Sequence, residues 1–248
     1  VQEALSVADP KARFTKSGRF GAWDGRQKFL RRPGNRFLAG LTQRVREIIE
    51  EAGGSVEIQD PLPPRMTSLL APKLFRSTLR PYQERAVAAV LDGDGRINLQ
   101  SPTASGKTVI GIEIARRIGL PVLWIVPRKR LMVQTAEMIH EELRCSVGRI
   151  GDGRWEPEDT TVAIIDSLAS VSADTLARWP VLIVDEAHHA PSARWASVIT
   201  TAPARIRVGM SGTATTRNPD PVRAMRLEGL FGPIVRVEES STLIEQGF

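Results

Sequence analysis

Short apolar runs alternate with amphipathic stretches through the last two-thirds of the chain. Residues 122–126 are apolar at all five positions, and comparable runs recur at 146–150, 161–166, 181–185 and 205–210. Such runs suit strands that are buried on both faces of a parallel sheet, and the segments between them are mostly long enough for helices. The alternation predicts an α/β fold with a doubly wound parallel sheet.

The first sixty residues follow a different pattern. Glycines separate several short segments before residue 41, which indicates turns between short strands. Apolar residues then recur at helical spacing, at Leu41, Val45, Ile48 and Ile49. Gly53 and Gly54 end that helix, and Val56 and Ile58 indicate a closing strand. We therefore predict a small α+β domain over residues 1–62, a stiff proline-rich linker over 63–74 and the α/β domain over 75–248.

Charge separates the two parts further. The whole chain has a net charge of +6, yet residues 11–46 hold eleven basic side chains and a single acidic one, Asp24. This basic surface predicts a polyanionic partner, most simply the phosphates of a nucleic acid. The candidate contacts are Arg19, Trp23, Arg26, Lys28, Arg31, Arg32 and Arg36. The aromatic side chains in this window either stack on bases or form the core of the small domain, and we favour the core.

Composition excludes some classes of protein. The single cysteine, Cys145, leaves no internal disulfide and fits a reducing compartment. No apolar run approaches the ~20 residues that a membrane span needs. Composition alone does not separate a nucleic acid from an anionic membrane surface as the partner. We expect a cytoplasmic protein, of prokaryotic or phage origin, with no membrane partner.

A strand, a loop of small residues and a helix follow one another from Arg96 onward. The loop ends in Gly106-Lys107-Thr108. Small side chains let backbone N–H groups approach phosphates, and the helix start adds its positive dipole end. Lys107 can reach the β- and γ-phosphates of a nucleotide, and the Thr108 hydroxyl can bind Mg²⁺. The nucleotide-binding candidates are Gln83, Pro102, Thr103, Ala104, Ser105, Gly106, Lys107 and Thr108; Ser101 and Ala104 stand where such loops often carry glycine.

Two adjacent carboxylates, Asp185 and Glu186, end the apolar run that starts at residue 181. Asp185 can hold Mg²⁺ together with Thr108, usually through water because Mg²⁺ keeps several waters. Glu186 can orient and deprotonate a water that attacks the γ-phosphate. With Lys107, the pair forms a plausible set for ATP hydrolysis. His188 and His189 are neighbours, so the zinc-binding pattern His-Glu-x-x-His is absent.

Three further stretches lie where ligands bind in such sheets. Gln83 opens a helix after Leu79-Arg80-Pro81, and its amide offers the donor and acceptor that read an adenine edge. Pro127, Arg128 and Lys129 follow an apolar strand, at the end where open α/β sheets bind ligands. Ser211, Gly212 and Thr213 follow another strand, and their hydroxyls can hydrogen-bond the carboxylate–histidine group.

With these stretches in this order, residues 75–248 resemble the first RecA-like motor domain of superfamily 2 nucleic-acid-dependent ATPases, which are P-loop NTPases. Residues 102–108 match the Walker A motif, and residues 185–188 match the DEAH form of Walker B. The Leu-Arg-Pro-Tyr-Gln form around Gln83 is similar to the branch of XPB, UvsW and the type III restriction enzymes. The segment from Gly21 to Arg26, with the helix that follows, looks like the small DNA-binding domain of UvsW-like phage helicases.

The resemblance implies an ATP- and Mg²⁺-dependent DNA helicase or translocase that unwinds or remodels branched duplex DNA. Segments that match Pro127, Arg128 and Lys129, and then Ser167, contact the nucleic-acid backbone in the family. The segment that matches Ser211, Gly212 and Thr213 couples hydrolysis to movement, and His188 would link the two sites.

The family also has a second RecA-like domain, which supplies an arginine finger. That domain would lie beyond Phe248, so we expect slow ATP hydrolysis by this chain alone. Three alternatives stay open: the motor subunit of a restriction system, an RNA helicase, and a DNA-binding clamp that uses ATP as a structural ligand.

Overall fold

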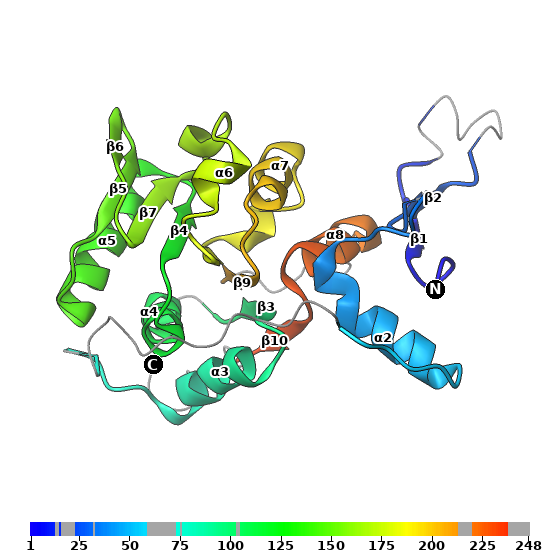
Figure 1. The fold of residues 1–248 in the computed structure, drawn as a ribbon, viewed down its shortest axis with the longest axis horizontal. Helices are drawn as coiled ribbons and strands as arrows, with labels where there is room; N and C mark the ends of the chain where they lie inside the picture. The colour runs from blue at the N-terminus through cyan, green and yellow to red at the C-terminus, as the bar shows by residue number, and fades with distance from the viewer. Residues whose placement is uncertain are drawn as a thin grey trace.

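The computed structural model describes residues 1–12, 15, 23–31, 33–58, 73–74, 76–102, 105–212 and 220–237. An eight-stranded sheet forms its centre, with strands in the order β10-β3-β9-β8-β4-β7-β5-β6 (Figure 1). All neighbouring strands are parallel except β5 and β6, which form an antiparallel hairpin at one edge. The predicted α/β fold with a mostly parallel sheet is confirmed.

The strands match the apolar runs. They are β3 (Arg96–Gln100), β4 (Val122–Val126), β5 (Gly148–Gly151), β6 (Arg154–Glu156), β7 (Thr160–Ile164), β8 (Val181–Val184), β9 (Ile206–Ser211) and β10 (Ile234–Arg236). The all-apolar strand β4 lies between β7 and β8, where both of its faces are covered. Sequence patterning did not predict β6 and β10, because each has only three residues, too few to show the period of a strand.

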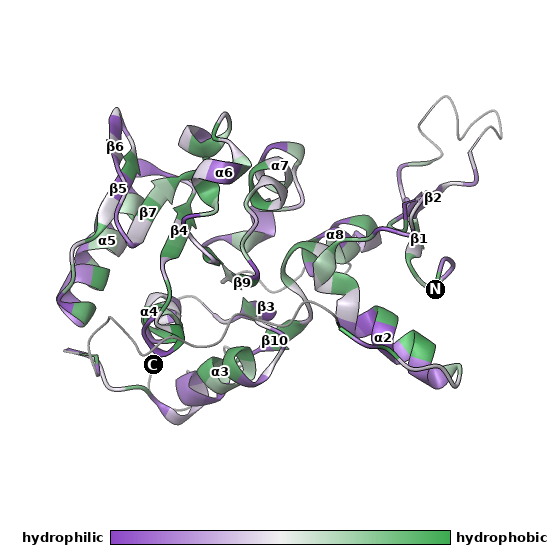
Figure 2. Ribbon diagram, in the orientation of Figure 1, coloured by the Kyte–Doolittle hydropathy of each residue, from purple (hydrophilic) through white to green (hydrophobic). Residues whose placement is uncertain are grey.

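Helices cover both faces of the sheet (Figures 1 and 2). They are α3 (Pro81–Asp92), α4 (Lys107–Ile118), α5 (Lys129–Leu143), α6 (Ala173–Leu176), α7 (Ala193–Thr201) and α8 (Pro221–Phe231), with 3-10 turns η3 (Ile165–Leu168) and η4 (Ala187–His189). Alternate residues of β4 divide between the two layers. Trp124 packs with α3, α4 and α5, while Leu123 and Ile125 pack with α6, α7 and α8. This division makes the sheet doubly wound.

The amino-terminal unit contains β1 (Ser6–Ala8) and β2 (Arg26–Lys28), which pair antiparallel, the 3-10 turn η2 (Ala39–Leu41) and helix α2 (Thr42–Glu51). Its fully buried Leu5 and Leu41 share one apolar cluster with Met225 of α8. Phe29 and Phe37 pack against the same cluster, in the core role that we favoured for the aromatic residues. The small unit is therefore packed onto a helix of the larger part.

Two polar or close contacts reinforce this packing. Arg44 forms a two-pronged ion pair with Glu228 of α8, at 2.8 and 2.7 Å. Gly40 lies so close to α8 that a Cβ there would collide with the Glu228 carbonyl oxygen. The expected strand at Val56 and Ile58 is wrong. Neither residue belongs to a strand or a helix in the described part of the chain, and Ile58 is 41% exposed.

Candidate functional site

The carboxyl ends of three neighbouring strands, β3, β9 and β8, meet at one edge of the sheet. β3 leads into the phosphate-loop candidate, β9 ends at Ser211, and β8 is followed by Asp185 and Glu186. The Ser101 amide donates to the Ser211 carbonyl at 3.0 Å, which ties the first two ends together. The topology thus brings together residues that lie more than 100 positions apart in the sequence.

Gly106 shapes the loop. It caps α4 with φ 77° and ψ 33°, in the left-handed region that glycine enters without strain. A Cβ there would lie 2.5 Å from the Gln83 amide nitrogen. The Ser101 and Ser105 hydroxyls hydrogen-bond across the base of the loop, and Lys107 Nζ donates to the carbonyls of Pro102 and Ser101 at 3.0 and 3.3 Å. The backbone carbonyls of Ser101 and Pro102 therefore hold the lysine ammonium. Thr103 and Ala104 lie outside the described residues.

Two side chains from α3 support the loop from behind. Tyr82 Oη and Gln83 Nε2 both donate to the Ser105 carbonyl, at 2.8 and 3.0 Å. The side-chain oxygen of Gln83 in turn accepts a hydrogen bond from the Arg80 backbone amide at 2.9 Å. Gln83 is 6% exposed, and its amide engages the backbone of this chain; its role in reading adenine stays a prediction. Tyr82 was not singled out from the sequence, although it stands beside Gln83 in the same motif.

Asp185 and Glu186 begin the turn after β8. Burial raises the pKa of Asp185; the Glu186 charge adds to this, while the Glu186 amide, which donates to Asp185 at 2.9 Å, and the Lys107 ammonium oppose it. Burial likewise lowers the pKa of Lys107, against the opposing charges of Asp185 and Glu186. The ammonium and the two carboxylates therefore lie within electrostatic reach of one another. A partly buried carboxylate in this state fits a divalent cation, which would compensate its desolvation.

Glu186 has φ 51° and ψ 42°, a left-handed conformation that is uncommon outside glycine and often marks functional turns. This conformation directs the chain into η4, where His188 approaches two of the candidate residues. His188 Nδ1 lies 3.1 Å from Glu186 Oε2 and 3.2 Å from Ser211 Oγ. The predicted carboxylate–histidine–serine group is thus assembled, with Ser211 itself buried. Gly212 follows it directly, and Thr213 lies outside the described residues.

A groove of about 740 Å³ opens on the other side of this turn. It lies between the turn after β8 and the two segments predicted to contact the nucleic-acid backbone. Its walls are formed by Pro127, Arg128, Arg130, Asp166, Glu186 and His188. Lys129 turns away from it and pairs with Asp152 at 2.6 Å, and Ser167 is exposed beside Asp166. Pro127 and Arg128 therefore lie in the groove, whereas Lys129 does not line it.

The amino-terminal candidates divide in a similar way. Arg26 donates to the Ser6 hydroxyl and carbonyl, at 2.9 and 2.7 Å, so it holds β1 and β2 together. Trp23 donates to the Arg26 carbonyl at 3.0 Å. Lys28, Arg31 and Arg36 line a second groove of about 570 Å³ between this unit and helices α7 and α8. Arg19 and Arg32 lie outside the described residues.

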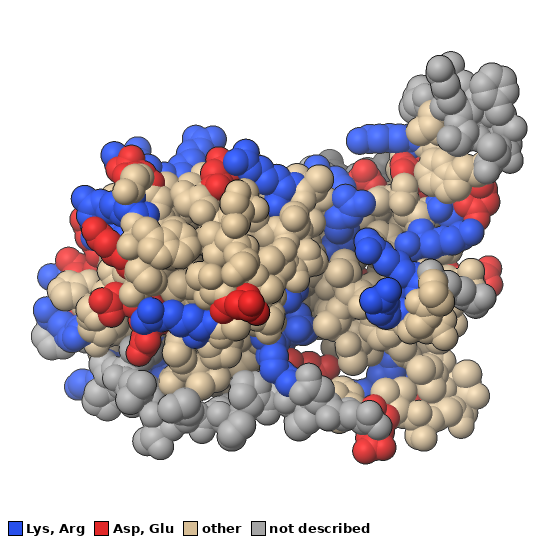
Figure 3. All heavy atoms as spheres, turned by 45° about the horizontal axis from the view of Figure 1, so that its top comes forward, with Lys and Arg blue, Asp and Glu red and all other residues tan. Residues whose placement is uncertain are grey.

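The second groove carries charge that the sequence did not reveal. Arg226 of α8 lines it opposite the amino-terminal cations, and no carboxylate lines it among the described residues. Lys and Arg side chains gather where the amino-terminal unit meets the larger part (Figure 3). Arg226 was missed because only the packing of α8 on η2 and β1 places it there, and that packing has no signature in the sequence.

No group of three or more His, Cys, Asp or Glu side chains in the described residues is arranged to hold a metal ion by itself, so a metal at Asp185 would need further ligands from water or nucleotide. No helix in the described part of the chain is long and apolar enough to cross a membrane.

Comparison with known proteins follows the same motifs. The family model described as "Type III restriction enzyme, res subunit" matches residues 76–216. The DNA 3'-5' translocase XPB2 of Sulfurisphaera tokodaii is 32% identical over 157 residues, which cover 63% of this chain and 35% of the translocase. The chain therefore spans about a third of the length of that relative.

Among solved structures, the UvsW helicase from bacteriophage T4 superposes with a TM-score of 0.71 at 22% identity, over 95% of this chain and 91% of that one. The Sulfolobus solfataricus SWI2/SNF2 ATPase core in complex with dsDNA superposes with a TM-score of 0.53 at 17% identity, over 66% and 38% of the two chains. At these identities the structures bear on the fold alone, and they confirm that it is RecA-like.

Proposed function

Because this chain belongs to the family of the type III restriction enzyme res subunit, as its motifs predicted, we propose that it is the ATP-binding part of a DNA translocase or helicase. The observation that carries the proposal is the meeting of Lys107, Ser211 and the Asp185–Glu186 pair at the ends of three adjacent strands. A phosphate-binding lysine, partly buried carboxylates and a hydroxyl that touches their histidine are the parts that nucleotide-driven motors need.

We propose that ATP and Mg²⁺ are the ligands of this site. The fit rests on two features: the left-handed Gly106, where any Cβ would intrude on Gln83, and the desolvated carboxylate of Asp185. Lys107 would exchange the loop carbonyls for phosphate oxygens, and Thr108 and Asp185 would hold the metal. When bound, ATP–Mg²⁺ supplies the phosphoryl group and neutralises part of its charge. Gln83 would contribute to nucleotide binding through the loop it supports.

Each remaining residue then has a role that its position allows. Glu186 would orient the attacking water and accept its proton at the carboxylate. His188, between Glu186 and Ser211, would connect that carboxylate to the end of β9. The same turn lines the groove that contains Pro127 and Arg128, so the nucleotide site and the candidate nucleic-acid site share one wall. We infer that this shared wall couples hydrolysis to movement along DNA.

The proposed partner is duplex or branched DNA, held in part by the amino-terminal cations. Lys28, Arg31 and Arg36 support this because they share a groove with Arg226. RNA is the less favoured partner. A protein that contacts only the nucleic-acid backbone distinguishes RNA from DNA through the 2′-hydroxyl alone. A second RecA-like domain is also a proposed partner, since full turnover in such motors needs an arginine from outside the phosphate loop.

Nucleotide binding is tested by titrating the chain with a fluorescent ATP analogue, with Mg²⁺ or with EDTA. Lys107→Ala should weaken binding by about 10- to 150-fold, the worth of a hydrogen bond to a charged group. Lys129→Ala is the matched control, because it removes the same charge from an exposed side chain that pairs with Asp152. Equal affinity of the two variants would contradict the assignment.

DNA binding is tested by fluorescence anisotropy of a labelled duplex over a salt series. Replacing Arg31 and Arg36 by alanine should weaken binding and make the salt slope shallower by about 0.9 for each phosphate that is no longer neutralised. Replacing Arg149 and Arg154, on the distant β5–β6 hairpin, is the control. If the control pair weakens binding as much, the charge acts without a defined site.

A further inference from the structure

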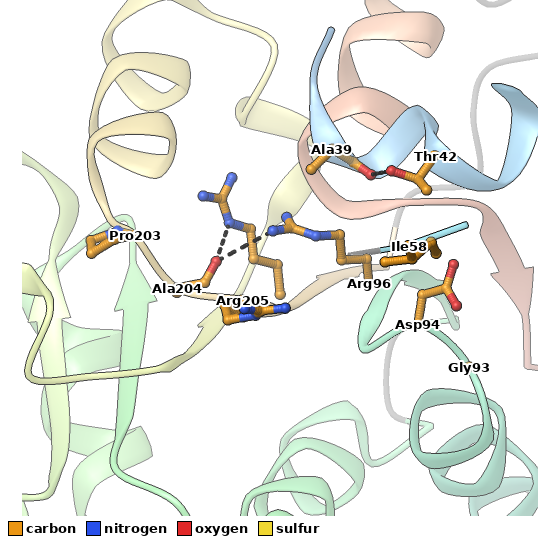
Figure 4. Close-up of a pocket in the computed structure, with 10 residues that line it drawn as sticks. Ala39, Thr42, Ile58, Gly93, Asp94, Arg96, Pro203, Ala204 and Arg205 are labelled. Carbon is orange, nitrogen blue, oxygen red and sulfur yellow. Dashed lines mark hydrogen bonds between the residues drawn. The ribbon is translucent and has the colours of Figure 1, made fainter. Parts of the chain in front are cut away.

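A second cavity lies at the opposite end of β3 from the phosphate loop (Figure 4). Its volume is about 600 Å³, and it lies between the amino-terminal unit and the starts of β3 and β9. Ala39, Thr42 and Ile58 form one wall, and Gly93, Asp94, Pro203 and Ala204 form the others. Five residues of β3 separate it from the loop, roughly 16 Å at about 3.3 Å per residue. The two sites are therefore distinct.

Three arginines, Arg96, Arg205 and Arg207, line this cavity, which we call the arginine pocket. Arg96 and Arg207 stand opposite each other in the parallel pairing of β3 and β9. Like charges directly opposite in a sheet are destabilising, and here the conflict is sharpened by burial, because Arg207 is only 9% exposed. Such a pair needs a source of negative charge.

The chain supplies only part of the negative charge that Arg96 and Arg207 need. Arg207 donates to the carbonyls of Ala202 and Ala204, at 2.8 and 3.0 Å, just beyond the carboxyl end of α7. Arg96 reaches the same Ala204 carbonyl at 3.5 Å (Figure 4). Arg96 Nη1 is buried and has no hydrogen-bond partner. Neither Arg96 nor Arg207 forms an ion pair with a carboxylate among the described residues.

Electrostatics agrees with this geometry. Burial, followed by the charge of Arg96, lowers the pKa of Arg207 to about 9. Burial, followed by the charge of Arg205, lowers the pKa of Arg96. Among the described residues, Asp94 is the carboxylate in the lining. Arg96 and Arg207 therefore present two guanidinium groups without an ion pair to a described carboxylate, an arrangement that suits a phosphate group.

We propose that the arginine pocket binds a phosphate group, as a second anion site separate from the phosphate loop. Guanidinium groups pair with phosphate oxygens through two parallel hydrogen bonds, and Arg96 Nη1 is the unused donor. The group belongs either to a small phosphorylated molecule or to a phosphodiester of DNA. Both offer the same oxygens to Arg96 and Arg207.

The test begins with Lys107→Ala as the background, so that phosphate binding at the loop does not contribute. Thermal unfolding is followed in potassium phosphate and in potassium chloride at matched ionic strength. At ten times its Kd, phosphate should raise Tm by about 3–6 °C. Adding Arg96→Gln should weaken phosphate binding by about 10-fold or more. Arg154→Gln, which removes the same charge from exposed β6, should leave it unchanged.

The proposal is overturned if phosphate gives no rise beyond chloride, if Arg96→Gln and Arg154→Gln respond alike, or if acetate stabilises as well as phosphate. A second measurement needs neither the Arg96→Gln nor the Arg154→Gln chain to fold. The Nε–H signal of Arg207, which is ordered by its bond to Ala204, should shift saturably in the NMR spectrum of the Lys107→Ala chain as phosphate is added. An unmoved signal also overturns it.

Further arms of the test distinguish the sources. In the first, inorganic phosphate and pyrophosphate are titrated alone; in the second, a 20-base-pair duplex is titrated against the same variants. A loss of duplex affinity in Arg96→Gln that Arg154→Gln does not share would assign the site to the DNA backbone. Tight pyrophosphate binding with unchanged duplex affinity would assign it to a small phosphorylated ligand.

Discussion

Gly106 is the residue on which the shape of the phosphate loop depends most directly. Its left-handed conformation costs any L-residue about 1–2 kcal/mol. A Cβ at this position would also lie 2.5 Å from Gln83 Nε2, so the amide must move and its hydrogen bond to Ser105 is lost, at about 0.5–1.5 kcal/mol. Gly106→Ala should therefore lower the free energy of unfolding by about 1.5–3.5 kcal/mol. For a chain of this size, Tm should fall by about 3–14 °C.

Gly153→Ala is the matched control, because Gly153 has φ +78° and nothing within 4 Å of a built Cβ. It should pay the conformational cost alone, a fall of about 2–8 °C, and keep wild-type ATP affinity. Gly106→Ala should lose ATP binding, because the moved amide and the new methyl group disturb the loop. The assays are thermal unfolding by circular dichroism and nucleotide titration. Equal falls in Tm, or unchanged ATP affinity in Gly106→Ala, would refute the reasoning.

Three further substitutions test other parts of the fold. Burial raises the pKa of Asp185, so the folded state loses stability as pH rises from 3.8 through that raised pKa. Asp185→Asn should therefore raise Tm at pH 8 without Mg²⁺ and abolish Mg²⁺-dependent ATP binding. A lower Tm would contradict this. Burial alone would raise the pKa of Glu113, but hydrogen bonds from two arginines of α4 outweigh burial and lower the pKa, so the stability that Glu113 contributes is present above pH 4.5 and lost in acid. Glu113→Gln should cost about 3 kcal/mol of unfolding free energy, measured in urea, at pH 7 and much less at pH 3. A cost independent of pH would be inconsistent with the ion pairs. Leu41→Ala, at a fully buried position against α8, should cost about 2–5 kcal/mol, whereas a cost below 1 kcal/mol would show that the amino-terminal unit is not packed there.

Residues whose environment depends on nearby sequence were predictable. The run 122–126 is apolar throughout because both faces of β4 are buried, and this condition leaves its mark at every position of the strand. The phosphate loop and the turn after β8 were predictable because their chemistry needs fixed residue types at fixed spacing. The proximity of Lys107 to Asp185 followed once both were placed at carboxyl ends of strands in one parallel sheet.

Features that depend on distant partners were not predictable. β10 is a three-residue edge strand that exists because β3 offers it a parallel partner. The turn around Gly40 is close-packed only because α8 lies against it. The opposition of Arg96 and Arg207 appears only when the register of β3 and β9 is known. A single sequence holds the residues of such contacts but no signal of their pairing.

Helix α8 contacts both the amino-terminal unit and the turn after β8. Near its start, Arg223 donates to the His188 carbonyl at 3.0 Å, and Arg226 donates to the Pro191 carbonyl at 2.9 Å, so the helix touches the segment after β8. Two turns of the same helix also carry Met225 and Glu228, which hold the amino-terminal unit through Leu41 and Arg44. Eleven residues of helix span about 16 Å. The turn that carries Glu186 and His188 is therefore joined to the basic amino-terminal unit by one helix, along a path that does not pass through the sheet.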